Sequence, residues 1–288
     1  RAKRAATGRG VADVLGASGR AHKARNWHAR RNAAGELAAN LAADPKVVDD
    51  VRAVLWGGKA KADALRTAVE GLGTAGNPAS TALLTELIRD KRAPTNARWH
   101  GIALMVTLHG IDSTVVDALI AVSQDERDPV YKTASAALAA VVHRARKKAP
   151  MAEQRAYNYL LARAESCFAL DHGDIRPTGA TESISQNPTL WVMALGNLGG
   201  AEIYPLIAPY LVDKRRWLRR HAIEALRFVP TNEARLAMIK AMQRDPSPYN
   251  RRLAAEKALY HPQYLMEEHV LRALREDQDA AAALGVNT

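Results

Sequence analysis

Apolar residues recur along this 288-residue chain three and four positions apart, which is the spacing of a helix. In "KADALRTAVEGLG" (61–73), Leu65, Ala68, Val69 and Leu72 follow that spacing and line one face. The pattern predicts helices over 33–43, 46–56, 60–72, 78–90, 95–109, 113–124, 129–147, 151–170, 189–198, 201–212, 214–228, 231–243, 248–260 and 262–276. No segment alternates apolar and polar residues over a strand's length, so essentially no sheet is expected.

Two stretches far apart in the chain repeat one another. "GLGTAGNPASTALLTELIRD" (71–90) aligns without a gap with "ALGNLGGAEIYPLIAPYLVD" (194–213), at an offset of 123 (194 − 71). That offset is three units of about 41 residues, within the period of HEAT and armadillo helix pairs. The repetition therefore predicts a stack of similar helix pairs.

A second element also recurs. "WLRRHAIEALRFV" (217–229) and "YNRRLAAEKALYH" (249–261) share Arg-Arg and a stripe of small residues followed by Leu, and "YKTASAALAAVVH" (131–143) carries the same stripe. Such a stripe lets a neighbouring helix approach closely. Asp128-Pro129 and Asp245-Pro246 suit an N-cap and the first position of a helix. The chain is predicted to be all-α, a two-layered right-handed α-solenoid of HEAT-like helix pairs.

Charge and composition divide the chain further. Residues 1–31 hold nine Lys and Arg against one acid, Asp13, although the whole chain carries only +11. Residues 1–32 are therefore predicted to be a basic leader or linker with at most short helical pieces, and a solvated linker is favoured over contact with nucleic acid or anionic lipid. The α-solenoid is predicted over 33–288: a first part (33–170), a polar loop (171–188), a second part (189–276) and a tail (277–288).

The hexapeptide "GLGTAG" (71–76) satisfies the dinucleotide-binding pattern G-x-G-x-x-G. That pattern requires a preceding strand, whereas the preceding residues have helical spacing, and the second copy has Ala194 in place of the first glycine. A structural turn is the favoured interpretation, with Gly73 ending one helix in a left-handed conformation and Asn77 and Pro78 starting the next. The predicted turn residues are Gly73, Gly76, Asn77, Pro78, Gly196 and Gly199.

Little in the sequence points to catalysis. Cys167 is the only cysteine, which excludes an intrachain disulfide and a thiolate zinc site, and a buried filler is favoured over a reactive thiol. His221 and Glu224 lie three apart on one helix and would supply two metal ligands, but an ion pair is favoured. No catalytic residue, metal site or cofactor is predicted, and the chain is expected not to be an enzyme. No apolar run reaches the length of a membrane-spanning helix.

The strongest local charge signal is "KRRWLRRH" (214–221). On a helix, Arg215 with Arg219 and Arg216 with Arg220 would form two adjacent cationic ridges beside Trp217. Arginine suits phosphate and carboxylate, and tryptophan can stack on a base. The candidate anion or partner contacts are Arg215, Arg216, Trp217, Arg219 and Arg220. The favoured alternative has Trp217 and Leu218 in the core, with the arginines solvated or paired with acids.

The order of these elements resembles the α-helical domain of vitellogenin-type large lipid transfer proteins. The likeness runs from about residue 37 to 276 and rests on "NLAADPKVVDDVRAVLWGG" with "GLGTAGNPASTALLTELI", then "TASAALAAVVHR", "MALGNLGGAEIYPLIAPYL", "LRRHAIEALRFVP" and "YNRRLAAEKALYHPQ". The family often carries a disulfide after the third of these elements, whereas residues 145–148 here contain no cysteine. The resemblance implies an exported protein whose helical arch braces a lipid-binding cavity.

Three functions follow as hypotheses. The first is a non-enzymatic scaffold that braces a lipid-binding protein, or β-rich domains of the same parent protein, or binds a protein partner through its curved face. The second is a HEAT-repeat protein–protein interaction adaptor without a lipid role. The third, placed last, is a basic HEAT-like protein that binds nucleic acid.

Overall fold

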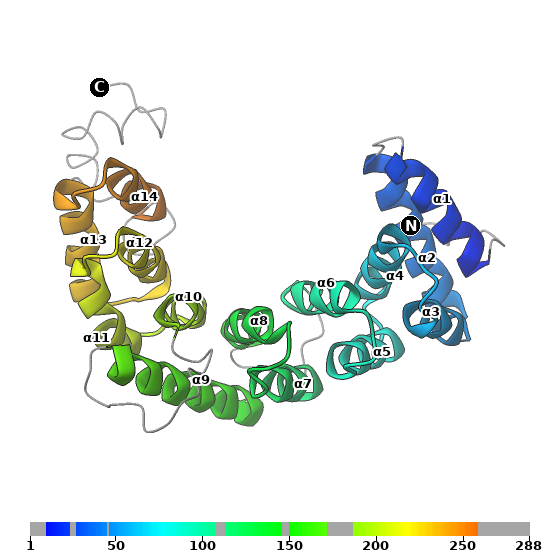
Figure 1. Cartoon of the computed structure of the whole chain (residues 1–288), viewed down its shortest axis with the longest axis horizontal. Helices are drawn as coiled ribbons and strands as arrows, with labels where there is room; N and C mark the ends of the chain where they lie inside the picture. The colour runs from blue at the N-terminus through cyan, green and yellow to red at the C-terminus, as the bar shows by residue number, and fades with distance from the viewer. Residues whose placement is uncertain are drawn as a thin grey trace. The chain divides into compact units, whose positions relative to one another are not determined.

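The computed structural model describes residues 10–23, 27–44, 46–107, 113–145, 150–171 and 187–258. Within these ranges the chain consists of helices joined by turns, without a strand, so the predicted all-α fold is confirmed (Figure 1). The predicted helix at 262–276, the tail at 277–288, most of the polar loop (172–186) and residues 1–9 lie outside the described residues. The chain divides into two compact units, residues 1–156 and 157–288.

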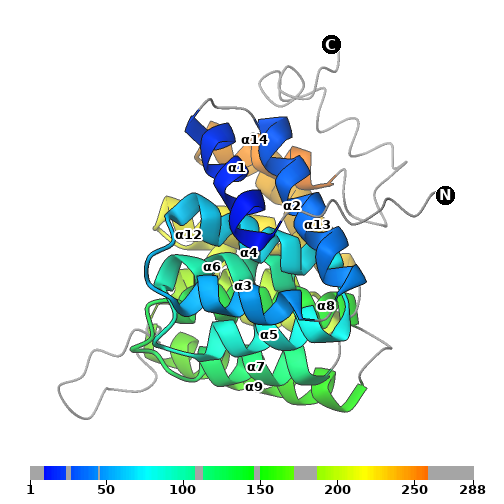
Figure 2. The ribbon, with the colours of Figure 1, turned by 90° about the vertical axis from the view of Figure 1, so that its right-hand side faces the viewer.

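The first unit contains two layers of helices. One layer is the succession α2, α4, α6 and α8, and the other is α3, α5 and α7, which Figure 2 shows stacked on one another. The helices are α1 (Val11–Lys23), α2 (Trp27–Ala43), α3 (Val47–Trp56), α4 (Ala62–Ala75), α5 (Pro78–Arg89), α6 (Thr95–Met105), α7 (Ser113–Ser123), α8 (Tyr131–Ala145) and the beginning of α9 (Pro150–Asp171). Polar contacts join successive pairs: the Trp56 indole donates to Asp90 and Lys91 pairs with Asp125, both across 34 positions. These contacts indicate a local period of about 34 residues instead of the 41 that the sequence offset suggested. The offset of 123 residues exceeds three such periods because α9 and the segment after it make one of the three repeats longer.

The second unit has the same two-layered plan. Helices α10, α12 and α14 pack side by side in one layer, and α11 with its flanking 3-10 turns and α13 form the other. Its elements after α9 are α10 (Pro188–Leu198), η2 (Ala201–Ile203), α11 (Tyr204–Ile207), η3 (Ala208–Val212), α12 (Arg216–Ala225), η4 (Leu226–Phe228), α13 (Asn232–Arg244) and α14 (Pro248–Ala258). The continuous helix predicted over 201–212 is therefore wrong. Pro209 cannot donate to the carbonyl of Pro205, and the chain tightens into 3-10 turns on both sides of α11.

The boundary predicted between leader and solenoid at residue 32 is too late. Helix α1 packs on α2 and α4, its Val14 is fully buried, and its Ser18 hydroxyl hydrogen-bonds that of Thr67 at 2.5 Å. Val11, Val14, Leu15 and Ser18 are the buried positions and have helical spacing. This short apolar stripe was overlooked in the sequence because the segment was classified by its excess of basic residues.

The predicted turn after α4 lies three residues later than Gly73. Helix α4 continues through Gly73, and Gly76 ends it in the left-handed conformation with φ 57°. Asn77 then caps α5 by accepting a hydrogen bond from the Ser80 amide at 2.8 Å, with Pro78 in the first turn.

The second copy of the turn has the same arrangement. Gly196 lies inside α10, and Gly199 ends that helix with φ 67°. Gly73 and Gly196 are therefore not turn residues. A methyl group on Gly196 would lie 2.6 Å from the Cα of Ala225, so this glycine permits close packing of α10 on α12.

The two Asp-Pro pairs do not start helices, since α8 begins at Tyr131 and α14 at Pro248. Each aspartate instead accepts a hydrogen bond from the amide two residues on, Val130 or Ser247, and closes a turn. Each is also held by a buried arginine of the preceding repeat: Arg98 binds Asp128 at 2.6 Å and Arg219 binds Asp245 at 2.9 Å. We call these two pairs the Arg–Asp clasps.

Candidate binding surface

The arginines around Trp217 divide into two groups with different roles. Arg215 lies directly before α12 and its guanidinium binds two carboxylates: Nη1 and Nη2 donate to Asp171 at 2.9 and 2.7 Å, and Nε donates to Asp213 at 2.9 Å. The hydrogen bond from Arg215 holds the pKa of Asp213 below its usual value. This guanidinium is occupied within the fold and is not available for a phosphate.

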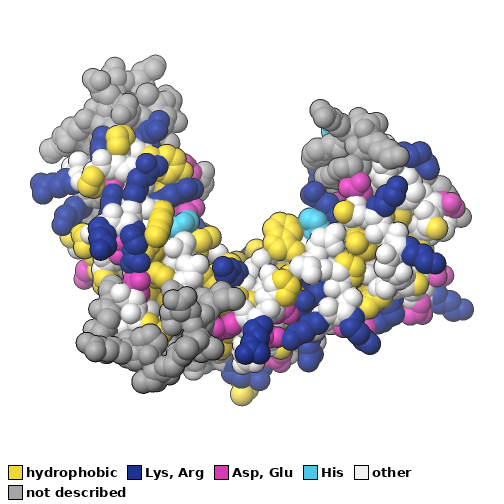
Figure 3. Space-filling view, in the orientation of Figure 1, with side chains coloured by type: hydrophobic (Ala, Val, Ile, Leu, Met, Phe, Trp, Pro, Cys, Tyr) yellow, Lys and Arg dark blue, Asp and Glu magenta, His cyan; other side chains and the backbone are white. Residues whose placement is uncertain are grey.

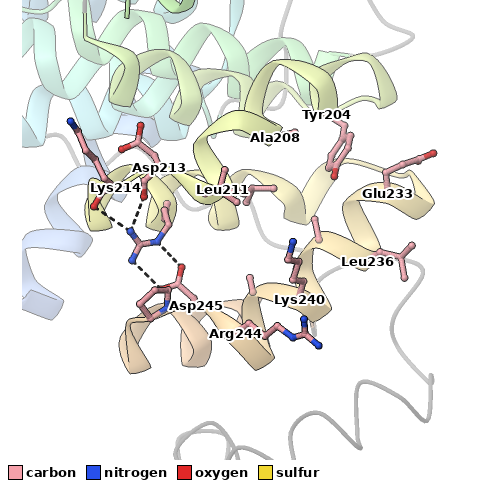
Figure 4. A pocket seen from close by; sticks show the side chains of 15 residues that line it. Tyr204, Ala208, Leu211, Asp213, Lys214, Glu233, Leu236, Lys240, Arg244 and Asp245 are labelled. Atoms are coloured by element: carbon pink, nitrogen blue, oxygen red, sulfur yellow. Dashed lines mark hydrogen bonds and ion pairs between the residues drawn. The ribbon is translucent and has the colours of Figure 1, made fainter. Parts of the chain in front are cut away.

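Arg219 is also directed inward. Its side chain is buried in the clasp with Asp245, and Nη1 donates to the carbonyl oxygen of Asp213 at 2.8 Å (Figure 4). Burial of Asp245 favours its neutral form, but hydrogen bonds from Arg219 and the Ser247 amide outweigh that effect and lower its pKa. The predicted ridge of Arg215 and Arg219 is therefore wrong as a binding surface, because both side chains tie repeats together.

Arg216 and Arg220 form the other ridge, and both are exposed. Their guanidinium carbons lie 5.7 and 5.0 Å from the ring centre of Tyr249 on α14, within the range of a cation–π contact. Within the described ranges neither guanidinium has an acidic partner. Arg216, Trp217, Arg220 and Tyr249 together are the α12–α14 patch, in a region where Figure 3 shows many Lys and Arg side chains over the second unit.

Trp217 does not anchor α12 in the core. Its side chain is 44% exposed and that of Tyr249 is 39% exposed, whereas Leu218 is fully buried. The favoured sequence interpretation was thus right for Leu218 and wrong for Trp217. Two large aromatic side chains beside two unpaired arginines are typical of a protein interface.

Tyr249 was missed as a surface residue, although the internal repeat marks it. In the alignment of 217–229 with 249–261, Tyr249 occupies the place of Trp217 and Arg251 that of Arg219. The structure preserves this equivalence, because Nη1 of Arg251 donates to the Asp245 carbonyl as Nη1 of Arg219 does to that of Asp213, both across six positions. The motif aromatic-x-Arg-Arg therefore places its aromatic residue outward and its first arginine inward.

His221 and Glu224 lie next to the patch on α12, with His221 Nδ1 3.7 Å from a carboxylate oxygen of Glu224. The pKa of Glu224 is lowered, chiefly by this histidine. They border a cavity of about 80 Å³ that Arg227 also lines. No group of three or more His, Cys, Asp or Glu side chains suited to a metal ion occurs in the part of the chain that the structure describes.

Cys167 lies in α9, and its side chain is buried. Burial raises the pKa of its thiol to about 12, so the group stays protonated at neutral pH and is a poor nucleophile. Among the described helices, none is long and apolar enough to cross a membrane.

Comparison with known proteins defines the class of this fold. Residues 190–260, which extend from within α10 to just beyond α14, match the family model for HEAT repeats, and no curated protein matches the chain. A solved structure that it resembles is human deoxyhypusine hydroxylase in complex with glycerol, with 14% identity, coverage of 89% of this chain and 96% of that chain, and a TM-score of 0.31. The match supports HEAT-like repeats over residues 190–260, as the internal repeats of the sequence predicted.

The comparisons do not support two more specific predictions, the absence of enzyme activity and the relationship to lipid transfer proteins. The prediction that the chain is not an enzyme is contradicted, because deoxyhypusine hydroxylase is an enzyme. A likeness at that TM-score assigns no reaction or site residue to this chain. The comparisons also give no support to the resemblance to vitellogenin-type lipid transfer proteins.

Proposed function

We propose that this chain is a helical-repeat scaffold that binds an acidic segment of a protein partner through the α12–α14 patch. The observation that carries the proposal is the pair Arg216 and Arg220, which lie one turn apart without an acidic partner in the described ranges. The guanidinium fork suits carboxylate groups, and the adjacent Trp217 and Tyr249 supply rigid apolar area for an interface. Residues of these types dominate the binding energy of protein interfaces.

The geometry favours a protein partner over nucleic acid. Binding to duplex DNA depends on several simultaneous phosphate contacts. With Arg215 and Arg219 bound by Asp171, Asp213 and Asp245, only two of these four arginines lack an acidic partner in the described ranges. A lipid-bracing role has no observation of its own in the described residues, since the patch is cationic rather than apolar.

Site-specific photocrosslinking tests the proposal. The photoreactive residue p-benzoylphenylalanine is placed at position 217 and, as a control, at the exposed Met151 of the first unit, in protein expressed in its source cells. We expect position 217 to yield a discrete crosslinked protein that resists nuclease and is absent from position 151. Crosslinked material that nuclease removes, or no product specific to position 217, would contradict the proposal.

A charge-reversal pair adds a quantitative control. Arg216→Glu with Arg220→Glu should reduce the yield of the crosslinked product at least tenfold. Lys59→Glu with Lys61→Glu makes the same change in net charge at exposed positions of the first unit and should leave the yield unchanged. Equal loss in both double variants would show general electrostatics instead of a defined surface.

A further inference from the structure

In the second unit, a groove separates α11 and its flanking 3-10 turns from α13, the two elements of the layer that packs on α10, α12 and α14. One wall is the segment from Tyr204 to Val212, and the other is α13 (Figure 4). The space between them is about 630 Å³, which lies in the range of sites that hold a ligand. In the first unit, by contrast, α5 packs directly against both α3 and α7.

Two features of the sequence leave the space between these walls open. Pro209 prevents the segment 201–212 from forming one regular helix, and the segment instead forms the short helix α11 between two 3-10 turns. Ala208, Ala237 and Ala241 line the space with the smallest side chain that an ordinary helix carries. A leucine at any of these positions would occupy volume that the structure leaves open.

The groove combines an apolar lining with charged side chains, which are Glu233 near Tyr204 and the cations Lys240 and Arg244 farther along α13. Leu211, Val212 and Leu236 line it, and Val212 and Leu236 are 74% and 53% exposed at its rim. Figure 4 shows Lys240 rising from α13 toward the opposite wall, with Arg244 one turn further on. Neither cation has an acidic partner within the described part of the chain.

The acidic groups at the same end are already occupied. Asp213 is bound by Arg215 and Asp245 by Arg219, so their charges are compensated. Lys240 and Arg244 therefore leave an uncompensated positive field beside an apolar surface. A ligand that satisfies both features must carry carboxylates next to apolar side chains.

We infer that this groove binds an amphipathic helix of a partner protein, with its apolar side chains against Leu211 and Leu236 and its carboxylates at Lys240 and Arg244. From Glu233 to Arg244 the wall covers three helical turns, about 16 Å at 1.5 Å per residue. A helix of similar length presents apolar residues at i, i+4 and i+7, which is how helices bind in grooves. A single acyl chain would leave the exposed rim residues Val212 and Leu236 uncovered, which favours the wider occupant.

A displayed library of random 16-residue peptides, selected against the full chain, tests the inference. We expect enriched peptides to share apolar residues three or four apart with Asp or Glu nearby. A synthetic copy of one such peptide, labelled with fluorescein, should bind the chain in a fluorescence-polarisation titration. Enrichment of no peptides, or of peptides without acidic residues, would overturn the inference.

Variants then locate the binding. Ala237→Leu should weaken the labelled peptide at least tenfold by filling the groove, whereas Gln243→Leu adds a leucine to α13 outside it and should have no effect. Lys240→Glu should also weaken binding at least tenfold, and a peptide with its acidic residues changed to lysine should restore it. Circular dichroism of each variant verifies that the fold is intact.

Two outcomes would contradict the inference at this stage. One is a peptide whose affinity is the same for the Ala237→Leu and Lys240→Glu variants as for the parent chain. The other is a dansyl-labelled fatty acid that binds the parent chain, displaces the peptide and is lost in Ala237→Leu, since this would identify an acyl-chain site. None of the four residues of the α12–α14 patch lines the groove, so Arg216→Glu with Arg220→Glu should weaken the peptide far less than Lys240→Glu does.

Discussion

Replacement of Gly196 by alanine isolates the effect of close helix packing in the second unit. The new methyl group would lie 2.6 Å from both the Cα and the Cβ of Ala225, a separation that carbon atoms do not tolerate. Helix α12 would have to move, and overpacking of this kind costs about 1–3 kcal/mol. Alanine gains about 1 kcal/mol over glycine as a helix former. Because the obstacle is main chain, the larger cost applies, and the free energy of unfolding should fall by about 2 kcal/mol.

Two other helical glycines provide matched controls. Gly73 occupies the equivalent position in the first copy of the repeat, where a methyl group would lie 3.2 Å from a Leu104 methyl carbon that can rotate away. Gly73→Ala should therefore be close to neutral, within about 0.5 kcal/mol of the parent, because the propensity gain offsets a small packing cost. Gly35 in α2 is exposed, with no atom within 4 Å of the new methyl group. Gly35→Ala should stabilise the protein by about 0.5–1 kcal/mol.

Urea unfolding combined with amide hydrogen exchange measures these changes. The midpoint and slope of the urea transition report the free energy of unfolding, and exchange protection in α10 and α12 shows whether the loss is confined to the second unit. The reasoning is refuted if Gly196→Ala is as stable as Gly35→Ala, since contact with Ala225 would then cost nothing.

Three further perturbations address the polar core and the cysteine. Arg219→Met should lower the free energy of unfolding of the second unit by about 3–5 kcal/mol, because it leaves Asp245 buried without its partner, and a second change of Asp245 to leucine should recover most of that loss in thermal unfolding. Because Arg215 lowers the pKa of Asp213, this carboxylate stabilises the folded state above its unfolded pKa of about 3.9, and the contribution disappears as pH falls through the lowered value. The stability difference between the parent and Asp213→Asn should accordingly vanish in strong acid, and a constant difference would be inconsistent with this linkage. Cys167, whose thiol pKa is raised to about 12, should react with iodoacetamide at pH 8 only after denaturation, and rapid labelling of the native protein would show that it is not buried.

The helical fold could be predicted because the residues that are buried on one face of a helix are apolar and recur every three or four positions in the sequence. Leu65, Ala68, Val69 and Leu72 are all buried in α4, as their spacing indicates. The packing of α1 on α2 and α4 was not predicted, because the buried stripe of α1 is short and lies among basic residues, so a leader with at most short helical pieces was expected. The spacing of apolar residues therefore has to be examined separately from the net charge of a segment when helices are predicted.

The exact turn position could not be predicted, because glycine serves two purposes at this point of the repeat. Gly76 and Gly199 adopt positive φ, whereas Gly73 and Gly196 lie within helices beside a neighbouring helix. A glycine that ends a helix and a glycine that admits a neighbouring helix are the same residue in the sequence, and only the structure around each one distinguishes the two roles.

The orientation of the arginines likewise depends on contacts between repeats. The sequence shows two equivalent pairs at helical spacing, and only the aspartates that they meet in the fold determine which pair is held by carboxylates. Asp171 and Asp213 bind Arg215, and Asp245 binds Arg219, while Arg216 and Arg220 face outward. The groove beside α13 could not be predicted from the sequence either, since an unfilled space between helices has no residue pattern of its own.

The Arg–Asp clasps also give each unit a particular response to mechanical load. In both clasps the guanidinium belongs to one repeat and the carboxylate to the turn before the next helix, as in Arg98 with Asp128. Tension along one unit passes through its clasp, because a repeat contacts only its neighbours. The clasp of each unit is thus expected to resist separation of the two repeats that it joins, and to re-form when the load is released.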